Sequence, residues 1–580
     1  MFNAENQNRE SCLHSSINKA ILFLSFVILS CAVQAPPSGG PVDRIPPEII
    51  ATDPLQGTLH VPRSLNRLKI IFSERMKESS IRNNLFISPP VKFKTEWKKG
   101  RILLFELQES LKPQQTYVLS IGSALQDMHN NKMAHSFTLA FSTGDTIDQG
   151  KIAGRIYGLK RNETFYVFAY LLNDTIAFNP FENKPDYVTL NGENGVYSLG
   201  FLKEGAYRVI AVEDRNHNLI LDGIMERFAL SFRDVILHDS LNQFSGLDMQ
   251  LAKLDTIAPM LTGARARFHN LLVVRFSEPP VLDSLSHISV EDSLNRQPLP
   301  IKAWGKSSEN GSWLEMVTAP MDSNRVYRLQ CLNIADSSGN RNRDTLISYF
   351  MGTARQDTAA FKLLHYLPKD SAKKVRPEAS VIVQFNQPVN WHQVALAFRL
   401  LKDSNNVVDG HWQIKNLYQA AFVPQKPLQP DHVYQSVLNL KRIQSYFNKT
   451  STDSLIRHVF FVISQKELGE ISGTIQTDFD LKHPVILNVR SVSGKRFHLR
   501  QIVHNKRTFK FNYLPEGAYK LDGFYDLNEN GKFDHGTIVP FRFCEPFKFM
   551  QDTIKVRKRW ETGGVIFTLP QPMETLNDSL

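Results

Sequence analysis

Cysteine is scarce in this chain, which has four cysteines in 580 residues. They stand at positions 12, 31, 331 and 544, with no Cys-x-x-Cys pair and no closely spaced set. This scarcity excludes a disulfide-stapled scaffold and a cysteine-rich zinc site, because both need clustered cysteines. Cys331 and Cys544 are more than two hundred residues apart, so we expect two buried free thiols and not one bridge.

The signatures of common catalytic sites are also missing. The 17 histidines include no His-Glu-x-x-His pair, and the chain has no Gly-x-Ser-x-Gly elbow, P-loop or dinucleotide-binding fingerprint. Ser371 and Lys374 fit a Ser-x-x-Lys pattern, but the companion elements of that enzyme class are absent. Glu74 and Glu278 each follow Phe-Ser in copies of a repeat, and repetition favours a backbone hydrogen bond at a strand end over catalysis. The sequence therefore predicts that the protein is not an enzyme.

Acidic residues are fewer than basic ones: 57 Asp and Glu face 68 Lys and Arg, which leaves a formal net charge of +11. The basic residues are spread along the chain apart from short clusters such as 555–559, so we interpret them as solvated surface and predict no nucleic-acid binding. Binding of an acidic glycan or another polyanion stays open as an alternative. Apolar residues make up 42% of the sequence, and the chain is too long for one core, so several domains are expected.

The amino terminus carries an apolar stretch, 20–29, that is too short to cross a bilayer as a helix but suits the core of a signal peptide. We therefore assign residues 1–30 to a signal peptide. Ile28-Leu29-Ser30-Cys31 resembles the lipobox of bacterial lipoproteins, which implies cleavage before Cys31, lipidation of its thiol and a lipid anchor in the outer membrane. Residues 31–43 are rich in Pro, Gly and Ala and are expected to form a tether. Ordinary secretion and a retained anchor are the alternatives.

A repeat of about a hundred residues, the size of an immunoglobulin domain, occurs three times. Each copy has an alternating strand that ends in Phe-Ser-Glu or a variant, a turn into a tyrosine-containing strand, and a closing Phe-rich strand. Such period-two alternation, with Pro, Asn, Asp and Gly between the strands, is typical of antiparallel sheets. The copies resemble the bacterial Ig-like domain of the S-layer-protein (SbsA) type, which implies two-sheet sandwiches; the third copy departs most. The alternating strands are 68–74, 271–278 and 381–387, and the tyrosines are Tyr117, Tyr327 and Tyr434.

A second repeat occurs twice. The motif 202–208, Leu-Lys-Glu-Gly-Ala-Tyr-Arg, recurs as Leu-Pro-Glu-Gly-Ala-Tyr-Lys at 514–520, and an upstream strand, 152–156, recurs at 471–475. This pair of motifs resembles the prealbumin-like or carboxypeptidase-regulatory β-sandwich.

We therefore predict an all-β chain: a tandem array of five β-sandwich domains, each folding around its own core, with few and short helices. The predicted ranges are signal peptide 1–30, tether 31–43, Ig-like 44–145, prealbumin-like 146–253, Ig-like 254–354, divergent Ig-like 355–465, prealbumin-like 466–570 and tail 571–580.

An acidic loop follows the tyrosine strand of each prealbumin-like copy. Oxygen-bearing side chains stand at positions one, three, five and nine, as in the first part of a calcium-binding loop. Neither copy has a glutamate at position twelve, although Glu226 lies one place beyond it, so any Ca²⁺ binding is expected to be weak. The alternative is that Asp and Asn only shape a turn. The candidate ligands are Asp214, Asn216, Asn218 and Asp222 in the first loop and Asp526, Asn528, Asn530 and Asp534 in the second.

These features favour a non-catalytic cell-envelope lipoprotein with a structural, adhesive or scaffold role, which is periplasmic or exposed on the cell surface and contacts envelope proteins or surface glycans. The alternative is a glycan- or polyanion-binding accessory lipoprotein of a nutrient-uptake system. Tryptophan rings can stack on sugars, but a sandwich core is their default place. The tryptophans in question are Trp97, Trp304, Trp313, Trp391 and Trp412.

Overall fold

The computed structural model of the chain describes residues 43–81, 84–161, 163–172, 178–223, 226–253, 257–493 and 497–572. The predicted signal peptide and Cys31 lie outside these residues. The described chain is all-β, as predicted, and its one α-helix is the short α2 (Trp391–Ala397). None of the helices in these ranges is long and apolar enough to cross a membrane.

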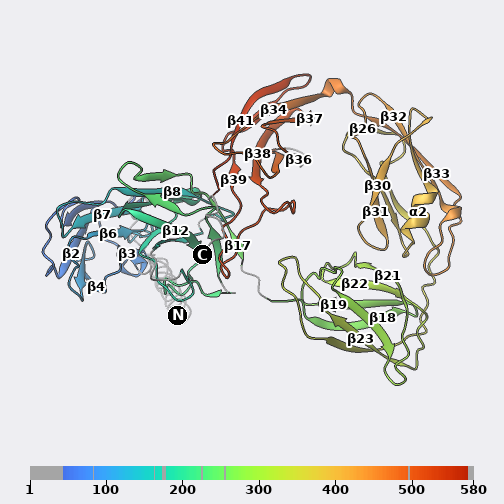
Figure 1. Cartoon of the computed structure of the whole chain (residues 1–580), viewed down its shortest axis with the longest axis horizontal. Coiled ribbons are helices and arrows are strands. Elements are labelled where there is room, and N and C mark those ends of the chain that lie inside the picture. Colours follow the sequence, from blue (N-terminus) through green and yellow to red (C-terminus); the bar gives the residue numbers. More distant parts are fainter. Residues whose placement is uncertain are drawn as a thin grey trace, which may run out of the picture.

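The described residues form ten sheets, which pair into five sandwiches that follow one another along the chain (Figure 1). We call them the first (β1–β7), second (β8–β17), third (β18–β24), fourth (β25–β33) and fifth (β34–β41) sandwich. The three Ig-like copies form the first, third and fourth sandwiches, and the two prealbumin-like copies form the second and fifth.

The Ig-like copies share one plan, a four-stranded sheet facing a second sheet, which has three strands in the first and third sandwiches. Alternate side chains of both sheets are buried, as in β2, where Leu68, Ile70 and Phe72 have no exposed surface. In the first sandwich, the four-stranded sheet contains β1 (Ile49–Asp53), β2 (Arg67–Phe72), β5 (Ile102–Leu107) and β4 (Phe93–Lys98). The facing sheet contains β3 (Leu85–Ser88), β6 (Thr116–Ile121) and β7 (Phe137–Ser142). In the third sandwich, the four-stranded sheet contains β18 (Leu261–Phe268), β19 (Leu271–Phe276), β22 (Trp313–Thr318) and β21 (Ile301–Lys306). The facing sheet contains β20 (His287–Asp292), β23 (Val326–Leu332) and β24 (Leu346–Met351).

The fourth sandwich repeats this plan with additions. Its first sheet contains β25 (Leu363–Leu367), β27 (Val381–Phe385), β31 (Gln419–Pro424) and β30 (Gly410–Ile414) in that order. The second sheet grows to five strands, because β26 (Ala372–Val375) pairs in parallel with β33 (Leu455–Val462), while β28 (Phe398–Lys402) and β29 (Asn406–Val407) extend the edge beside β32 (Val433–Asn439).

The second and fifth sandwiches share another topology, in which the opening strand pairs in parallel with a late one. In the second sandwich, one sheet contains β11 (Val196–Leu202), β8 (Gly150–Tyr157), β15 (Gln243–Ser245) and β16 (Met249–Gln250). The facing sheet contains β10 (Tyr187–Leu190), β9 (Tyr166–Leu171), β12 (Gly205–Val212), β13 (Arg227–Leu230), β14 (Val235–Leu237) and β17 (Ala252–Lys253). In the fifth sandwich, one sheet contains β37 (Thr508–Pro515), β34 (Leu468–Gln476) and β41 (Glu561–Thr568). The facing sheet contains β36 (His498–Val503), β35 (Val485–Ser491), β38 (Gly517–Tyr525), β39 (Phe547–Phe549) and β40 (Ile554–Val556).

The repeated tyrosines tie each strand to the turn before it. In the Ig-like copies the hydroxyl group accepts a backbone N–H from five residues earlier, over 2.7 Å for Tyr117, 2.9 Å for Tyr327 and 2.8 Å for Tyr434. In the other repeat the hydroxyl group of Tyr207 or Tyr519 donates to the carbonyl oxygen four residues earlier, at 2.7 Å in both. Because a buried hydroxyl group needs a partner, these bonds explain why tyrosine and not phenylalanine marks both motifs.

The five sandwiches do not all fold around separate cores, which corrects the prediction of independent modules. The fifth sandwich returns to the second, and one hydrophobic cluster contains side chains of both, with Ile152 and Tyr207 of the second beside Phe524, Cys544 and Phe547 of the fifth. Figure 1 shows the second, third, fourth and fifth sandwiches arranged around a ring, with the third and fourth on the side opposite this contact and the first sandwich outside the ring. Alternation in the sequence predicts which side chains are buried but not which sheet covers them.

A long connection in the fifth sandwich, residues 533–547, makes much of this contact, and we call it the docking arm. Its Phe541 ring lies 3.9 Å from the guanidinium carbon of Arg208 in β12, and the backbone N–H of Cys544 donates to the carbonyl oxygen of Ser231 at 3.2 Å. Arg208 is held in place by two hydrogen bonds to Asp234, of 2.9 and 2.7 Å. The arm therefore joins the two repeats through aromatic, cationic and backbone contacts.

The other junctions of the ring are smaller. Between the third and fourth sandwiches, the hydroxyl group of Tyr418 donates to the buried carboxylate of Glu315 at 2.5 Å. Between the fourth and fifth, the ammonium group of Lys374 lies 2.8 Å from the carboxylate of Glu467. Cys331 lies in the core of the third sandwich, and it and Cys544 are both buried free thiols, as predicted.

Candidate functional site

The first Asp-Asn loop follows β12 and brings its predicted residues together. Asp214 is buried, and its carboxylate oxygens accept the backbone N–H groups of Asn218 at 3.2 Å and Leu219 at 2.9 Å. The side chains of Asn216 and Asn218 both donate to the carboxylate of Asp222. The four predicted positions therefore form one compact turn with their polar groups directed inward.

The second loop, after β38, repeats most of this arrangement. Asp526 is buried and accepts the backbone N–H groups of Asn530 at 3.1 Å and Gly531 at 2.8 Å. The side chain of Asn528 donates to the carboxylate of Asp534. The sixth residue is left-handed in both loops, with φ of 61° at Leu219 and 73° at Gly531, a conformation that glycine adopts without strain.

A glutamate completes each loop, and sequence reasoning missed the second one. Glu226 accepts the backbone N–H groups of Arg215 and Asp222, both at 2.8 Å. Glu545 accepts the corresponding N–H groups of Leu527 at 2.8 Å and Asp534 at 3.0 Å. Glu545 stands on the docking arm, eleven residues beyond the last predicted ligand, and the intervening insertion hid the correspondence.

Burial sets the electrostatics of these glutamates. Desolvation, followed by the smaller effect of Asp526 and Asp534, raises the pKa of Glu545 to about 7. Desolvation also raises the pKa of Glu226. A bound cation reverses this effect because it favours the ionised carboxylate. Each loop thus gathers two aspartates, two asparagines and one glutamate, the oxygen-rich set that Ca²⁺ prefers.

The remaining candidates from the sequence are the Ser-x-x-Lys residues and the tryptophans. The ammonium group of Lys374 pairs with Glu467, and the hydroxyl group of Ser371 faces Asp370 at 3.4 Å, so the Ser-x-x-Lys pattern does not form a nucleophile–base pair. Trp391 is buried in the fourth sandwich, whereas Trp304 is 51% exposed. Trp560, which the sequence did not single out, is 70% exposed.

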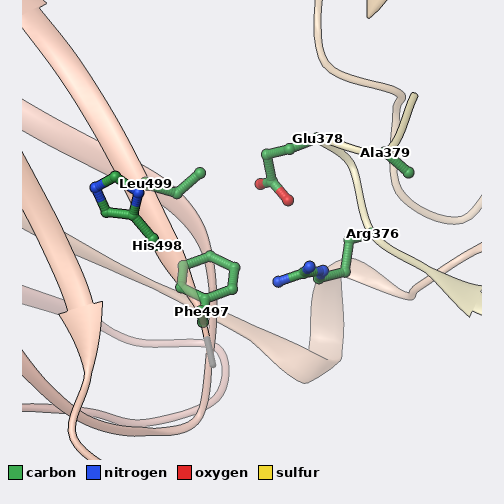
Figure 2. Close-up of a pocket in the computed structure, with 6 residues that line it drawn as sticks. All are labelled: Arg376, Glu378, Ala379, Phe497, His498 and Leu499. Carbon is green, nitrogen blue, oxygen red and sulfur yellow. The ribbon is translucent and has the colours of Figure 1, made fainter. Parts of the chain in front are cut away.

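A pocket of about 260 Å³ lies between the fourth and fifth sandwiches (Figure 2). Arg376 and Glu378 line it from the fourth sandwich, and Phe497, His498 and Leu499 line it from the fifth. The guanidinium carbon of Arg376 lies 5.0 Å from the centre of the Phe497 ring, and burial lowers the pKa of His498. His498 faces the side chain of Asn488 at 3.2 Å within the fifth sandwich, whereas the contact of Arg376 with Phe497 crosses the junction.

The sequence matches the family model of the bacterial Ig-like domain at residues 43–143 and 357–460. The chain therefore contains bacterial Ig-like domains, in the first and fourth sandwiches. The fourth is matched although its sequence departs most from the repeat. No curated protein matches the sequence.

Several solved structures are similar at low identity. The S-layer protein rSbsC(31-844) is 10% identical, with 89% of this chain and 67% of that chain covered and a TM-score of 0.14. L,D-transpeptidase 3 from Mycobacterium tuberculosis is 12% identical over 21% of this chain and 42% of the transpeptidase, also with a TM-score of 0.14. The alpha-2-macroglobulin of E. coli is 10% identical, covering 83% of this chain and 33% of that chain, with a TM-score of 0.14. TM-scores this low carry no argument about function.

Proposed function

We propose that the protein is a non-catalytic cell-envelope lipoprotein, anchored in the outer membrane through Cys31, whose sandwiches serve as a scaffold or adhesive surface. The observation that carries the scaffold role is the shared core of the second and fifth sandwiches, which joins two distant parts of the chain. A closed ring of sandwiches holds its outer faces at set positions, which suits a spacer or docking platform. Of the polar groups singled out for catalysis, Ser371 faces Asp370 and Lys374 pairs with Glu467.

Fatty-acid labelling combined with protease treatment of intact cells tests the anchor and the exposure together. The expected result is labelled fatty acid on the wild-type protein, none on Cys31→Ser, and cleavage of the sandwiches by external protease only if they face outward. Equal labelling of the Cys31→Ser variant, or a mature amino terminus upstream of residue 31, refutes the anchor. A periplasmic location appears as labelling without cleavage and leaves the scaffold role in place.

Calcium binding by the two Asp-Asn loops is part of the proposal. The preformed turns and the glutamate found in each support it, and the small number of carboxylates sets the expected dissociation constant at about 10⁻⁴ to 10⁻³ M. Calorimetry of the full chain with Ca²⁺ tests it. The double variant Asp526→Ala with Asn528→Ala is expected to lose one of two binding events, and an unchanged isotherm or no heat at millimolar Ca²⁺ refutes the idea.

Glycan binding is a second candidate, favoured by the exposed rings of Trp304 and Trp560 and by the excess of basic residues. Exposed aromatic rings offer flat faces on which sugars stack. A pull-down against cell-surface polysaccharides distinguishes the two functions. Retention that salt weakens and that Trp304→Ala with Trp560→Ala abolishes supports glycan binding, while no retention supports the scaffold.

A further inference from the structure

The third sandwich exposes an apolar face on its smaller sheet, which β20, β23 and β24 form. Tyr349 and Met351 are each 60% exposed, Ile347 is 44% exposed and Val326 is 38% exposed. They alternate with less exposed side chains along β23 and β24, so all four point to the outer side of the sheet, which we call the β24 face. An antiparallel sheet that meets water normally carries polar side chains on that side, so this face has the character of an interaction surface.

The equivalent face of the first sandwich packs against the second sandwich. The hydroxyl oxygen of Ser88 in β3 accepts the backbone N–H group of Val188 in β10 at 3.2 Å. The ring of Phe86, also in β3, meets the ring of Tyr166 in β9 edge-on, with 5.4 Å between their centres. In the one Ig-like copy where the chain itself covers this face, the cover is therefore another β-sandwich.

The two faces can be compared position by position. In both copies the repeated tyrosine stacks on a phenylalanine of the closing strand, which fixes the register of β7 against β24. Ala140, which has no exposed surface, then corresponds to Tyr349, and Thr138 corresponds to Ile347. The exposed face is thus larger and more apolar than the covered one. Contact with water favours the opposite, so the residues of the third sandwich indicate that its face is covered as well.

The junction with the fourth sandwich leaves the β24 face free. That junction uses the other sheet of the third sandwich, where Leu271 of β19 and Val317 of β22 pack against Leu417. Figure 1 shows β23 on the side of the third sandwich that lies away from the fourth. Within the described ranges, the exposed fractions given above show that no other sandwich covers the face, so its cover comes from another molecule.

The charges on the β24 face are complementary to themselves. Glu291 of β20 and Arg328 of β23 stand opposite each other, with 3.1 Å between their charged groups. A two-fold axis through this pair places Arg328 of one copy opposite Glu291 of the other. In the fourth sandwich the same face carries two arginines, Arg399 and Arg457, on either side of Val437. Like charges repel when such a face meets itself, so self-association favours the third sandwich.

We infer that the protein dimerises through the β24 face, which packs on the same face of a second copy about a two-fold axis. Such dimers are the commonest homo-oligomers, because one self-complementary surface serves both copies. Three strands about 4.8 Å apart, each with about six residues at about 3.3 Å per residue, give a face of about 300 Å². A stable interface buries about 800 Å² per partner. The dimer is therefore weak in solution, and confinement of the copies to a membrane strengthens it by raising their effective concentration.

Sedimentation velocity of the full chain from about 1 µM to about 1 mM tests the dimer, because mass action shifts a weak equilibrium over this range. We expect a dimer that grows with concentration, and Tyr349→Glu is expected to lower its association constant at least about tenfold, since it buries a charge without a partner. Trp304→Glu is the matched control, because it changes a half-exposed ring on the other sheet of the same sandwich. A monomer at every concentration overturns the inference, as does equal association of the Tyr349→Glu variant.

Cysteine crosslinking in isolated membranes identifies what covers the face. Tyr349 is the cross-strand neighbour of Arg328 and so lies close to the two-fold axis. With a short bis-maleimide reagent, Tyr349→Cys is expected to give a crosslinked homodimer, while Trp304→Cys and the parent chain give none. A crosslink from Tyr349→Cys to a different protein, or to another segment of the same chain, overturns the second copy as the occupant. These results do not depend on the Asp-Asn loops or on lipidation of Cys31.

Discussion

Replacing Phe541 with alanine tests whether the docking arm closes the ring. The Phe541 ring lies 3.9 Å from the Arg208 guanidinium carbon and 5.1 Å from the centre of the Phe178 ring, both in the second sandwich. A partly desolvated cation–π contact contributes about 0.5–2 kcal/mol and an aromatic pair about 0.5–1.5 kcal/mol. Losing both weakens docking by about 1–3.5 kcal/mol, which raises the open fraction of the ring by a factor of about 5 to 300.

The two buried thiols provide the assay. Cys544 lies in the cluster shared by the second and fifth sandwiches, whereas Cys331 lies in the core of the third. Burial raises the pKa of both thiols, to about 12 for Cys331, so neither reacts with an alkylating agent until its site opens. Alkylation followed by peptide mass spectrometry reads the two rates in one sample, and the Cys544 rate follows the open fraction when closing is fast.

We expect Phe541→Ala to accelerate alkylation of Cys544 by the factor given above and to leave Cys331 unchanged. Trp560→Ala is the control, because it removes an exposed ring of the fifth sandwich outside this contact. An unchanged Cys544 rate refutes the role of the arm. Equal acceleration of both thiols means that the whole chain unfolds more readily, which refutes a local opening of the ring.

Three further predictions concern single side chains. Because burial raises the pKa of Glu545 from 4.5 to about 7, its contribution to stability is fully present below pH 4.5 and is lost, by at most about 3 kcal/mol, as the pH rises through 7. With a chelator present, calorimetry should therefore show a higher melting temperature for Glu545→Gln than for wild type at pH 8 but not at pH 4.5. Addition of Ca²⁺ should reverse this order at pH 8. Equal melting temperatures of the two proteins at every pH contradict the prediction. Tyr418→Phe removes the hydroxyl donor of the buried Glu315 carboxylate and should cost about 1–3 kcal/mol, measured by denaturant unfolding against Tyr349→Phe, whose ring is exposed. Tyr519→Phe should cost about 1 kcal/mol through the lost bond to the carbonyl oxygen of Pro515, and a melting curve identical to wild type would show that the repeated tyrosine acts through its ring alone.

The local features of the fold were predictable because they depend on neighbours in the sequence. Alternation in strands such as 68–72 indicated the buried face, and Leu68, Ile70 and Phe72 are buried. The repeated tyrosines bond to residues only four or five positions away. The Asp-Asn loops also close within nine residues, so their spacing alone predicted which side chains meet.

The candidate site was only partly predictable. Asp526 and Asp534 stand in one loop and share a pattern with Asp214 and Asp222, but Glu545 reaches the same loop only because the docking arm folds back. The grouping of Asp43, Glu74 and Asp127 at one end of the first sandwich was not predicted. These residues stand far apart in the sequence, so no local spacing connects them.

The strands, their buried faces, the two repeats and the turns follow from the order of the residues, since period-two alternation and short-range hydrogen bonds act between near neighbours. The closing of the ring, the glutamate of the second loop and the grouping of Asp43 with Glu74 and Asp127 depend on contacts between distant segments, up to 394 positions apart for Gln551 and Tyr157. Hydrophobic burial is non-directional, so an apolar face does not specify its partner; only the packed sheets select it.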